Sequence, residues 1–567
     1  MGWIWTTAVS VIVFFYLLQQ FANLGKKKKL PPGPTGLPVL GHFHLLGKNP
    51  HQDLHRLARK HGPIMYMRFG TVPTIIVSSP AAAELFLKKH DLVFANKPHH
   101  EASNYLGYEQ RNISFGRYGP YWRNMRKLVT LELLSNLKIS QFQPMRKAEI
   151  DILVDSLKSA AEIGETVDMS VRIASVSADM TCLLVFGRKY ADKDLNEKGL
   201  KEVMKETMEE AAAFNLGDYF PYLRGLDLQG SARRLKKLSK IFDGFLERII
   251  DDHVENKKEK QQSSQDLVDT MMRIMESGEA GFDFDRRHVK AVLLRRGGRR
   301  LPHPRAKAIT QRNEGDRRFP SIEGDAVAHG SEGDVGHPEA AAEGSGGGEA
   351  VEGSGGGGGR EADGDMLLGG METSATTVEW ALSEVIRHPA VTKKLQKELE
   401  EVVGLDQTVN ESHLSSLKYL DYVVRESMRL HPVGPLLIHE GMEDCEVEGF
   451  YILKKSRVLV NVWAIGRNPD AWTDPETFSP ERFLGSNVDV RGRDFQLIPF
   501  GTGRRGCPGL QLGLTIVQLI VAQLVHCFDW ELPDEMQPGE LDMSENFGLV
   551  TTRAKHLMAI PKYRLHQ

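Results

Sequence analysis

The sequence predicts a large, mainly α-helical domain with small β-sheets, preceded by an N-terminal transmembrane helix. Three observations predict this fold class. Many stretches place apolar residues at the spacing of an amphipathic helix, only short runs alternate at the spacing of a strand, and the chain begins with an unbroken apolar segment. With 567 residues, 41% of them hydrophobic, the chain can form one very large domain or several ordinary ones.

Residues 1–25 are interpreted as a membrane anchor. From Trp3 to about Leu24 the chain carries no charged residue, and roughly 20 such residues can span a bilayer. Lysines 26–29 follow at once, within a basic and proline-rich hinge over residues 26–36, so the positive-inside rule leaves the remainder of the chain in the cytosol. The alternative is a cleaved signal peptide, although such a peptide usually places its charge before the apolar segment.

After the hinge, the pattern of apolar residues predicts each element in turn. A hairpin over residues 64–69 and 74–78 precedes a helix that is capped by Ser79 and runs to about His90. Further amphipathic helices are predicted over residues 121–134, 147–161, 171–185, 200–213, 232–255, 389–403 and 417–430, a fully buried helix over 510–528, and strands over 457–461 and 555–560.

Residues 295–364 interrupt this pattern with a composition rich in Gly, Glu, Arg and Ala. Such a segment buries too little apolar surface to order itself and is interpreted as a disordered insertion. If its flanks, residues 289–294 and 365–373, are joined, they continue one apolar helix. We therefore interpret the insertion as a retained intron or an error in the gene model rather than as a functional domain.

Charge and cysteine content exclude some classes of protein. The net charge is −3, which does not indicate binding to nucleic acid. The four cysteines, Cys182, Cys445, Cys507 and Cys527, lack the spacing of a zinc finger or a disulfide framework. Their scarcity is typical of a reducing compartment.

The most informative motif is the run of residues 500–509, which surrounds Cys507. Arg504 and Arg505 precede this cysteine, and an apolar helix begins just after it at about Leu510. Nearby positive charge and backbone N–H groups stabilise a thiolate, and the glycines let the backbone approach a flat cofactor. Cys507 is therefore predicted to be a metal ligand, and the alternative is a glycine-rich turn with a buried free cysteine.

The spacing Phe-x-x-Gly-x-Arg-x-Cys-x-Gly resembles the haem-binding loop of the cytochrome P450 monooxygenases. Residues 31–34, 464–467 and 480–483 resemble the plant microsomal A-type members of that family, and the motifs follow the family order. The resemblance implies a P450 fold for residues 37–567, interrupted by the insertion. It also implies haem b, with the Cys507 thiolate as iron ligand. Further haem contacts implied in this loop are Phe500, Arg505 and Gly509.

Residues 369–374 resemble the central-helix motif of the family. The resemblance makes Glu372 and Thr373 the pair that delivers protons to the distal side of the haem, since a hydroxyl beside a carboxylate can organise water. Taken alone, the motif also fits an ordinary helix start with Ser/Thr capping. Trp122 and Arg126 share one helix face and resemble the pair that holds a haem propionate, and the alternative is a core tryptophan beside a solvated arginine.

Two other groups follow from the resemblance. Arg505 is expected to bind a propionate, and His439 lies where the family often has a propionate-binding Arg or His, although the usual preceding proline is absent; the alternative is a solvent-facing histidine. Glu426 and Arg429 lie one turn apart and are expected to form a structural network with Arg482, whereas a surface ion pair is the alternative.

The resemblance also implies partners and location: O2, NADPH, a membrane-bound NADPH–cytochrome P450 reductase, and a single-pass position in the endoplasmic reticulum membrane with a cytosolic catalytic domain. It assigns the pocket lining to residues 104–116, 214–222, 368–373, 433–438 and 547–550, which are largely apolar. The expected function is hydroxylation of a lipophilic small molecule, with a terpenoid favoured over a phenylpropanoid or flavonoid.

Two alternatives of other classes remain. One is a P450-fold isomerase or dehydratase that acts without O2, against which the intact Glu372–Thr373 pair argues. The other is a catalytically impaired, haem-binding or unfolded product of the insertion.

Overall fold

A computed structural model describes residues 29–106, 112–190, 199–255, 266–279, 282, 284, 286–293 and 366–566. The predicted anchor, the first three residues of the hinge (26–28) and the predicted disordered insertion at 295–364 lie outside the described residues. On either side of the insertion the structure has a helix, α13 (Arg286–Leu293) and α14 (Met366–Arg387). The interpretation of these flanks as one helix therefore stays a prediction.

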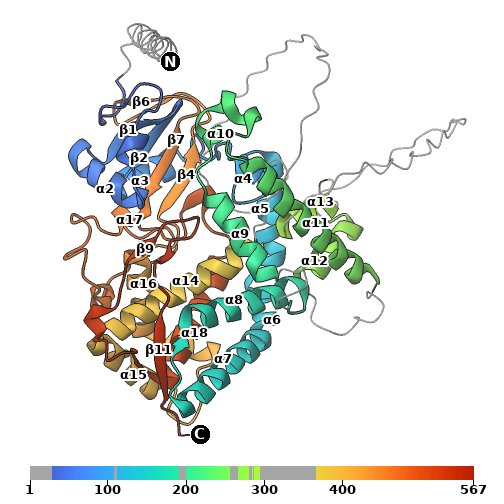
Figure 1. Ribbon diagram of the computed structural model, residues 1–567, viewed down its shortest axis with the longest axis vertical. Helices are drawn as coiled ribbons and strands as arrows, with labels where there is room; N and C mark the ends of the chain where they lie inside the picture. The colour runs from blue at the N-terminus through green and yellow to red at the C-terminus, as the bar shows by residue number, and fades with distance from the viewer. Residues whose placement is uncertain are drawn as a thin grey trace, which may run out of the picture. The chain divides into compact units, whose positions relative to one another are not determined.

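Helices make up most of the described chain (Figure 1). Those after the first strands match the predicted amphipathic segments closely, while the short helices α2, α4, α6, α10 and α17 and the longer α12 were not predicted. The remaining helices are α2 (Pro50–His61), α3 (Pro80–Glu84), α4 (Glu101–Leu106), α5 (Pro120–Leu128), α6 (Asn136–Gln141), α7 (Gln143–Ile163), α8 (Met169–Phe186), α9 (Leu200–Ala212), α10 (Leu216–Tyr219), α11 (Ser231–Glu255), α12 (Leu267–Ser277), α15 (Pro389–Val402), α16 (Lys418–Leu430), α17 (Val462–Ile465) and α18 (Leu510–Cys527).

The largest sheet has four strands in the order β1-β2-β7-β4. The predicted hairpin is confirmed as β1 (Ile64–Phe69) and β2 (Val72–Val77), and β2 runs parallel to β7 (Arg457–Asn461), which in turn pairs antiparallel with β4 (Leu436–Glu440). As predicted, Ser79 caps α3 by accepting a hydrogen bond from the N–H of Ala82.

Three smaller sheets complete the fold. A three-stranded sheet has the order β3-β11-β8, and two hairpins pair β5 with β6 and β9 with β10. The strand predicted at residues 555–560 is β11 and begins three residues later, because residues 554 and 555 form a bend before it. These strands are β3 (Val167–Asp168), β5 (Cys445–Val447), β6 (Phe450–Ile452), β8 (Phe528–Glu531), β9 (Glu545–Asn546), β10 (Thr552–Arg553) and β11 (Met558–Tyr563).

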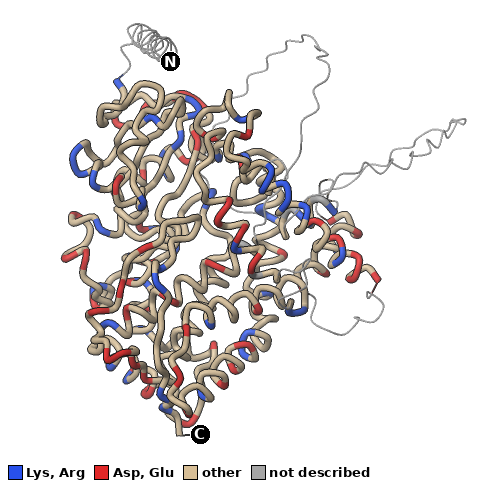
Figure 2. Tube along the Cα trace, viewed as in Figure 1, with Lys and Arg blue, Asp and Glu red and all other residues tan. Residues whose placement is uncertain are grey.

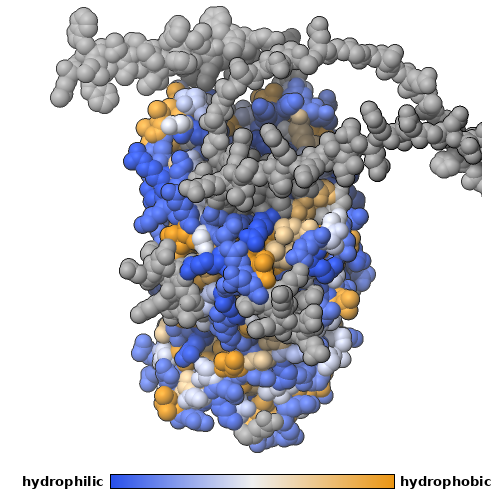
Figure 3. Space-filling model, turned by 90° about the vertical axis from the view of Figure 1, so that its right-hand side faces the viewer, coloured by the Kyte–Doolittle hydropathy of each residue, from blue (hydrophilic) through white to orange (hydrophobic). Residues whose placement is uncertain are grey.

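Helix α14 lies among α8, α16 and α18, which all contact it (Figure 1). Among the described helices, α8 and α18 are long and apolar enough to span a membrane, but most of each is buried inside the domain. Their apolar residues therefore belong to the core of the fold. Charged residues of both signs are interspersed along the described chain (Figure 2). The face of the molecule drawn in Figure 3 is mostly hydrophilic, with small apolar groups.

The predicted structural network is confirmed on the side of α16. Arg429 donates from Nε and Nη2 to the two carboxylate oxygens of Glu426, each at 2.8 Å, and both side chains are fully buried. Arg482 donates from Nε to Glu426 Oε1 at 2.8 Å. Arg429 also donates to the backbone carbonyls of Gly466 and Pro475, so the buried Glu426–Arg429 pair is satisfied by protein groups.

Candidate active site

A cavity of about 440 Å³ lies between α14, the loop before α18 and the strand β4; we call it the central cavity. Its walls are mainly apolar. Its polar groups include hydroxyls of α14 and the side chains of Lys97, Arg126 and Arg505, which we call the cationic end. Its lining includes Ile113, Phe115, Val129, Leu134, Met180, Leu184, Met366, Val433, Leu436, Leu437, Phe500, Leu512, Leu549 and Val550. Such a cavity suits a bulky, flat or apolar ligand.

The sulfur of Cys507 lies on the wall of the central cavity that the loop before α18 forms. The loop folds back because the Cys507 N–H donates to the Phe500 carbonyl at 2.8 Å, with Gly501 and Gly503 at φ of +67° and +64°. The side chain is exposed to the cavity, yet the surrounding protein raises the pKa of the thiol. The Gly509 N–H and the charge of Arg126 act in the opposite direction.

Small and hydroxyl-bearing residues of α14 form another part of the cavity wall. Thr373 lines the cavity, and its Oγ1 donates to the Gly369 carbonyl at 2.5 Å. One turn later, Thr377 Oγ1 donates to the Thr373 carbonyl at 2.8 Å. Gly370 allows α8 to approach, because a Cβ at this position would lie 3.0 Å from Thr181 Oγ1. The hydroxyl oxygen of Thr373 keeps lone pairs that can accept a hydrogen bond from water.

The structure separates the two members of the predicted distal pair. Glu372 is half-buried and is not among the described residues that line the central cavity. Burial raises the pKa of its carboxyl, and the charge of Lys205 on α9 lowers it. A carboxylate next to a hydroxyl in sequence points about 100° away from it around a helix. Thr373 therefore faces the cavity, whereas Glu372 faces the side of α9.

Three predicted cofactor-binding residues meet at the cationic end of the cavity: Trp122, Arg126 and Arg505. The Arg505 guanidinium lies 4.0 Å from the centre of the Trp122 ring. Trp122 Nε1 donates to the Ile113 carbonyl at 2.9 Å, and Arg505 donates from Nε to the Ala95 carbonyl at 2.6 Å. Backbone carbonyls thus hold this pair in place beside the cavity.

His439 also lies at this end, on β4, and is buried, so it is not the solvent-facing histidine of the alternative interpretation. Its Nδ1 lies 2.9 Å from the Phe94 carbonyl, which can only accept, so Nδ1 carries the proton. Burial lowers the pKa of His439 to about 3, with help from Lys97 and Arg505. The imidazole is therefore neutral, and its Nε2 is an acceptor rather than a donor to a carboxylate.

Sequence reasoning missed Lys97. This lysine lines the central cavity and donates from Nζ to the Ile438 carbonyl at 2.6 Å, and burial lowers its pKa to about 7. It lies in a loop after the first helices, where no periodicity marks an inward-facing residue. Its position beside Pro98 indicates a turn or an extended segment and does not indicate that the lysine lines a cavity.

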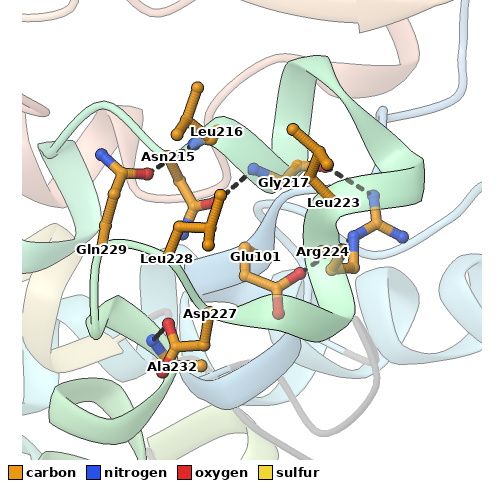
Figure 4. Close-up of a pocket in the computed structure, with 10 residues that line it drawn as sticks. All are labelled: Glu101, Asn215, Leu216, Gly217, Leu223, Arg224, Asp227, Leu228, Gln229 and Ala232. Atoms are coloured by element: carbon orange, nitrogen blue, oxygen red, sulfur yellow. Dashed lines mark hydrogen bonds and ion pairs between the residues drawn. The ribbon is translucent and has the colours of Figure 1, made fainter. Parts of the chain in front are cut away.

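Four of the five segments predicted to line the pocket contribute to the central cavity, and the prediction for residues 214–222 was wrong. Instead, the Phe214 ring stacks on Tyr219, and both contact Phe43 below the four-stranded sheet. Asn215 and Gly217 border a second cavity of about 10 Å³, beside Glu101 (Figure 4). That volume holds about one water molecule, so it is no substrate site.

The residues around the central cavity fit a haem. A thiol that is surrounded by protein and yet accessible from a cavity could bind the iron of such a group. Gly509 leaves space beside it, since a Cβ there would lie 3.8 Å from the sulfur. Basic side chains at the cationic end of the cavity, from Arg126 and Arg505, match the carboxylates of such a group. The fold and this donor set define a haem-thiolate protein.

Comparison with known proteins agrees with this class. The family model described as Cytochrome P450 matches residues 31–295 and 360–558 and leaves out the residues between them. The chain belongs to the cytochrome P450 family of monooxygenases. It is 43% identical over 558 residues to cytochrome P450 CYP736A12 of Panax ginseng, with 97% of each chain covered.

Other relatives are also plant proteins. Cytochrome P450 84A1 of Arabidopsis thaliana is 35% identical over 566 residues, which cover 99% of this chain and 96% of the relative. A flavonoid 3'-monooxygenase of Crocosmia x crocosmiiflora, CYP75B137, is 35% identical over 573 residues, with 99% and 98% covered. The resemblance that the motifs indicated is therefore confirmed at the level of the family.

Proposed function

We propose that this monooxygenase hydroxylates a lipophilic plant specialised metabolite, with a terpenoid as the favoured substrate. The single observation that carries the proposal is that Cys507 lines a large, mainly apolar cavity, which Thr373 lines as well. A charged or strongly hydrated substrate would have to give up its water in such a cavity without compensation. An apolar substrate gains free energy there.

In this proposal Cys507 binds the iron of haem b, and Phe500 and Gly509 shape the surface beside the ligand. Arg126, Arg505, Trp122 and His439 surround the propionate end; His439 takes part as a neutral ring unless a carboxylate beside it restores its proton. When bound, a haem with a thiolate ligand supplies the activation of O2 and favours cleavage of the O–O bond.

Thr373 has the role of holding a proton donor at the cavity. Its hydroxyl hydrogen is given to the Gly369 carbonyl, so the oxygen accepts from a water molecule and orients that water toward the cavity. Glu372 lies outside the cavity lining, on the side of α9, where burial raises the pKa of its carboxyl and the charge of Lys205 lowers it. Its proposed part in proton delivery therefore needs a path around α14 to the water at Thr373, because the two side chains face different sides of the helix.

The electrons come, in this proposal, from NADPH through a membrane-bound NADPH–cytochrome P450 reductase. The anchor predicted at residues 1–25 keeps the enzyme on the endoplasmic reticulum membrane by a single span, with the catalytic domain in the cytosol. Both proteins then diffuse in the same membrane, and the lipophilic substrate partitions into it.

A phenylpropanoid or flavonoid is the alternative substrate class. The relatives named flavonoid 3'-monooxygenase favour it, because they are similar to this chain over nearly its full length. A panel of terpenoids and flavonoids, each tested for NADPH-dependent product formation and O2 consumption, separates the two classes. Product formation without O2 would instead support the isomerase or dehydratase alternative.

The haem site is tested by the reduced carbon-monoxide difference spectrum of the full chain. We expect Cys507→Ser to abolish the thiolate-type band, because an alcohol oxygen is a harder donor that does not supply the same electron density. Cys445→Ser is the matched control, since Cys445 is half-exposed on β5 and remote from the cavity lining. Survival of the band in Cys507→Ser would remove Cys507 from the site.

A further inference from the structure

The backbone of Thr551 connects two walls of the central cavity. Its N–H donates to the carbonyl of Val433 at 2.9 Å, and its own carbonyl accepts from Nε1 of Trp380 at 3.2 Å. Val433 lies on the segment after α16, and Leu549 and Val550 lie directly before Thr551; all three line the cavity. The backbone of Thr551 therefore makes one hydrogen bond to the Val433 carbonyl and accepts another from the Trp380 side chain, which belongs to α14.

Trp380 is held in place on its other sides. It is 1% exposed, and its ring stacks on the ring of His431 with centroids 4.1 Å apart and planes 3° apart. The guanidinium of Arg553 lies 5.6 Å from the same ring. His431 is itself fixed by a 2.7 Å hydrogen bond between Nε2 and the carboxylate of Glu384, one turn along α14. Trp380 has therefore little freedom to follow a moving neighbour.

From this arrangement we infer that Trp380 is a positioning residue for substrate specificity. It does not line the cavity, but its N–H fixes the Thr551 peptide and, through it, the distance between the Val433 wall and the Leu549–Val550 wall. These walls decide which shapes the cavity accepts. The inference rests on the proposed function, because it assigns the specificity of the same cavity.

Hydrogen exchange of the full chain tests the bridge, and the change is Trp380→Phe. Phenylalanine keeps a ring against His431 but has no N–H, so the Thr551 carbonyl loses its partner. We expect exchange about fivefold faster in peptides that contain residues 432–438 and 547–553, because opening now breaks one buried hydrogen bond fewer. Peptides of α7 and α15 should exchange as in the wild type.

Two controls separate the bridge from general loosening. Trp530→Phe removes an N–H that donates to the Leu524 carbonyl at 2.9 Å, outside the cavity lining. Thr551→Ala keeps both backbone hydrogen bonds and removes a hydroxyl that has no hydrogen-bond partner in the described part of the chain. Neither control should accelerate exchange at the two walls.

The effect on the cavity is read with two iron ligands of different shape, imidazole and 4-phenylimidazole, titrated spectroscopically. In Trp380→Phe we expect the ratio of their dissociation constants to change about fourfold, which corresponds to roughly one methylene contact with the phenyl ring. The imidazole constant itself should stay unchanged. A merely structural role would change both constants together or neither.

Unchanged exchange at both walls in Trp380→Phe, or equal acceleration in Trp530→Phe, would overturn the inference. If Trp380→Phe does not fold, hydrogen exchange of the wild type tests the bridge instead. The Thr551 amide should then exchange slowly although it lies outside the strands. Fast exchange of this amide would refute the bridge. Hydrogen exchange can be measured whether or not haem is bound. A missing carbon-monoxide band would therefore contradict the proposed function but would not change the hydrogen-exchange result for Trp380→Phe.

Discussion

Glu426→Gln is expected to weaken the folded state strongly, because Glu426 is the only carboxylate that the structure places between Arg429 and Arg482. Its Oε1 accepts from Arg429, from Arg482 and from the Ser479 N–H, each at 2.8 Å. Oε2 accepts from Arg429 Nε at 2.8 Å. In glutamine one of these oxygens becomes an NH2 group, which cannot accept and points its hydrogens at a guanidinium.

The size of the effect follows from burial. The Arg429 side chain is 0% exposed and that of Arg482 is 11% exposed, so water cannot replace the lost charge. Breaking a buried ion pair from one side costs about 3–5 kcal/mol of the free energy of unfolding. Whole domains have about 5–15 kcal/mol. The variant should therefore lose about a fifth or more of its stability and release haem at lower denaturant concentration.

Urea unfolding followed by far-UV circular dichroism and by haem absorbance measures this loss. Glu481→Gln is the matched control, from the same short segment as Arg482. Glu481 pairs with Lys394, but its side chain is 40% exposed, and exposed pairs contribute about 0–1 kcal/mol. Equal unfolding midpoints for the two variants would refute the reasoning that the buried network stabilises this face of the fold.

Three further outcomes are expected. Thr373→Ala should keep haem binding and divert electrons to peroxide, measured as product formed per NADPH consumed; an unchanged ratio would contradict the role of the hydroxyl. Deleting residues 295–364 should raise haem incorporation and turnover, since the family model passes over most of this segment, and equal activity of both forms would show that the fold tolerates it. Burial alone would raise the pKa of Glu545, but hydrogen bonds from His51 and Trp463 lower it to about 2, from 4.5. Its stabilisation is therefore present above pH 4.5 and is lost as the pH falls toward 2, so Glu545→Gln should flatten the dependence of unfolding on pH in this window.

Features that depend on short-range pattern could be predicted from the sequence. The longer amphipathic helices that were predicted, the first hairpin and the network of Glu426 with Arg429 need only periodicity or a motif of nearby residues. The Cys507 loop is equally local, since its hydrogen bond to Phe500 spans seven residues. For these elements neighbours in sequence are also neighbours in space.

Features that depend on packing could not be predicted in this way. Lys97 reaches the cavity because the Ile438 carbonyl, far along the chain, accepts a hydrogen bond from its Nζ. The motif at 369–374 contains both Glu372 and Thr373, but only the rotation of α14 against α8 and α9 decides which of them faces the cavity. Likewise, residues 214–222 carry an apolar pattern that fits either a pocket wall or the layer below the sheet.

The parallel pairing of β2 with β7 has a consequence for how the protein is made. Thr74–Val77 lie against residues 457–460, so the partner of β2 leaves the ribosome roughly 380 residues later, about 20–80 s at ordinary rates of synthesis. During this time the hairpin β1–β2 has an unpaired edge with Ile75, Ile76 and Val77, which are all buried in the finished domain. Such an edge can pair with other chains. Nascent chains of this protein should therefore depend on chaperones until the last third has been synthesised.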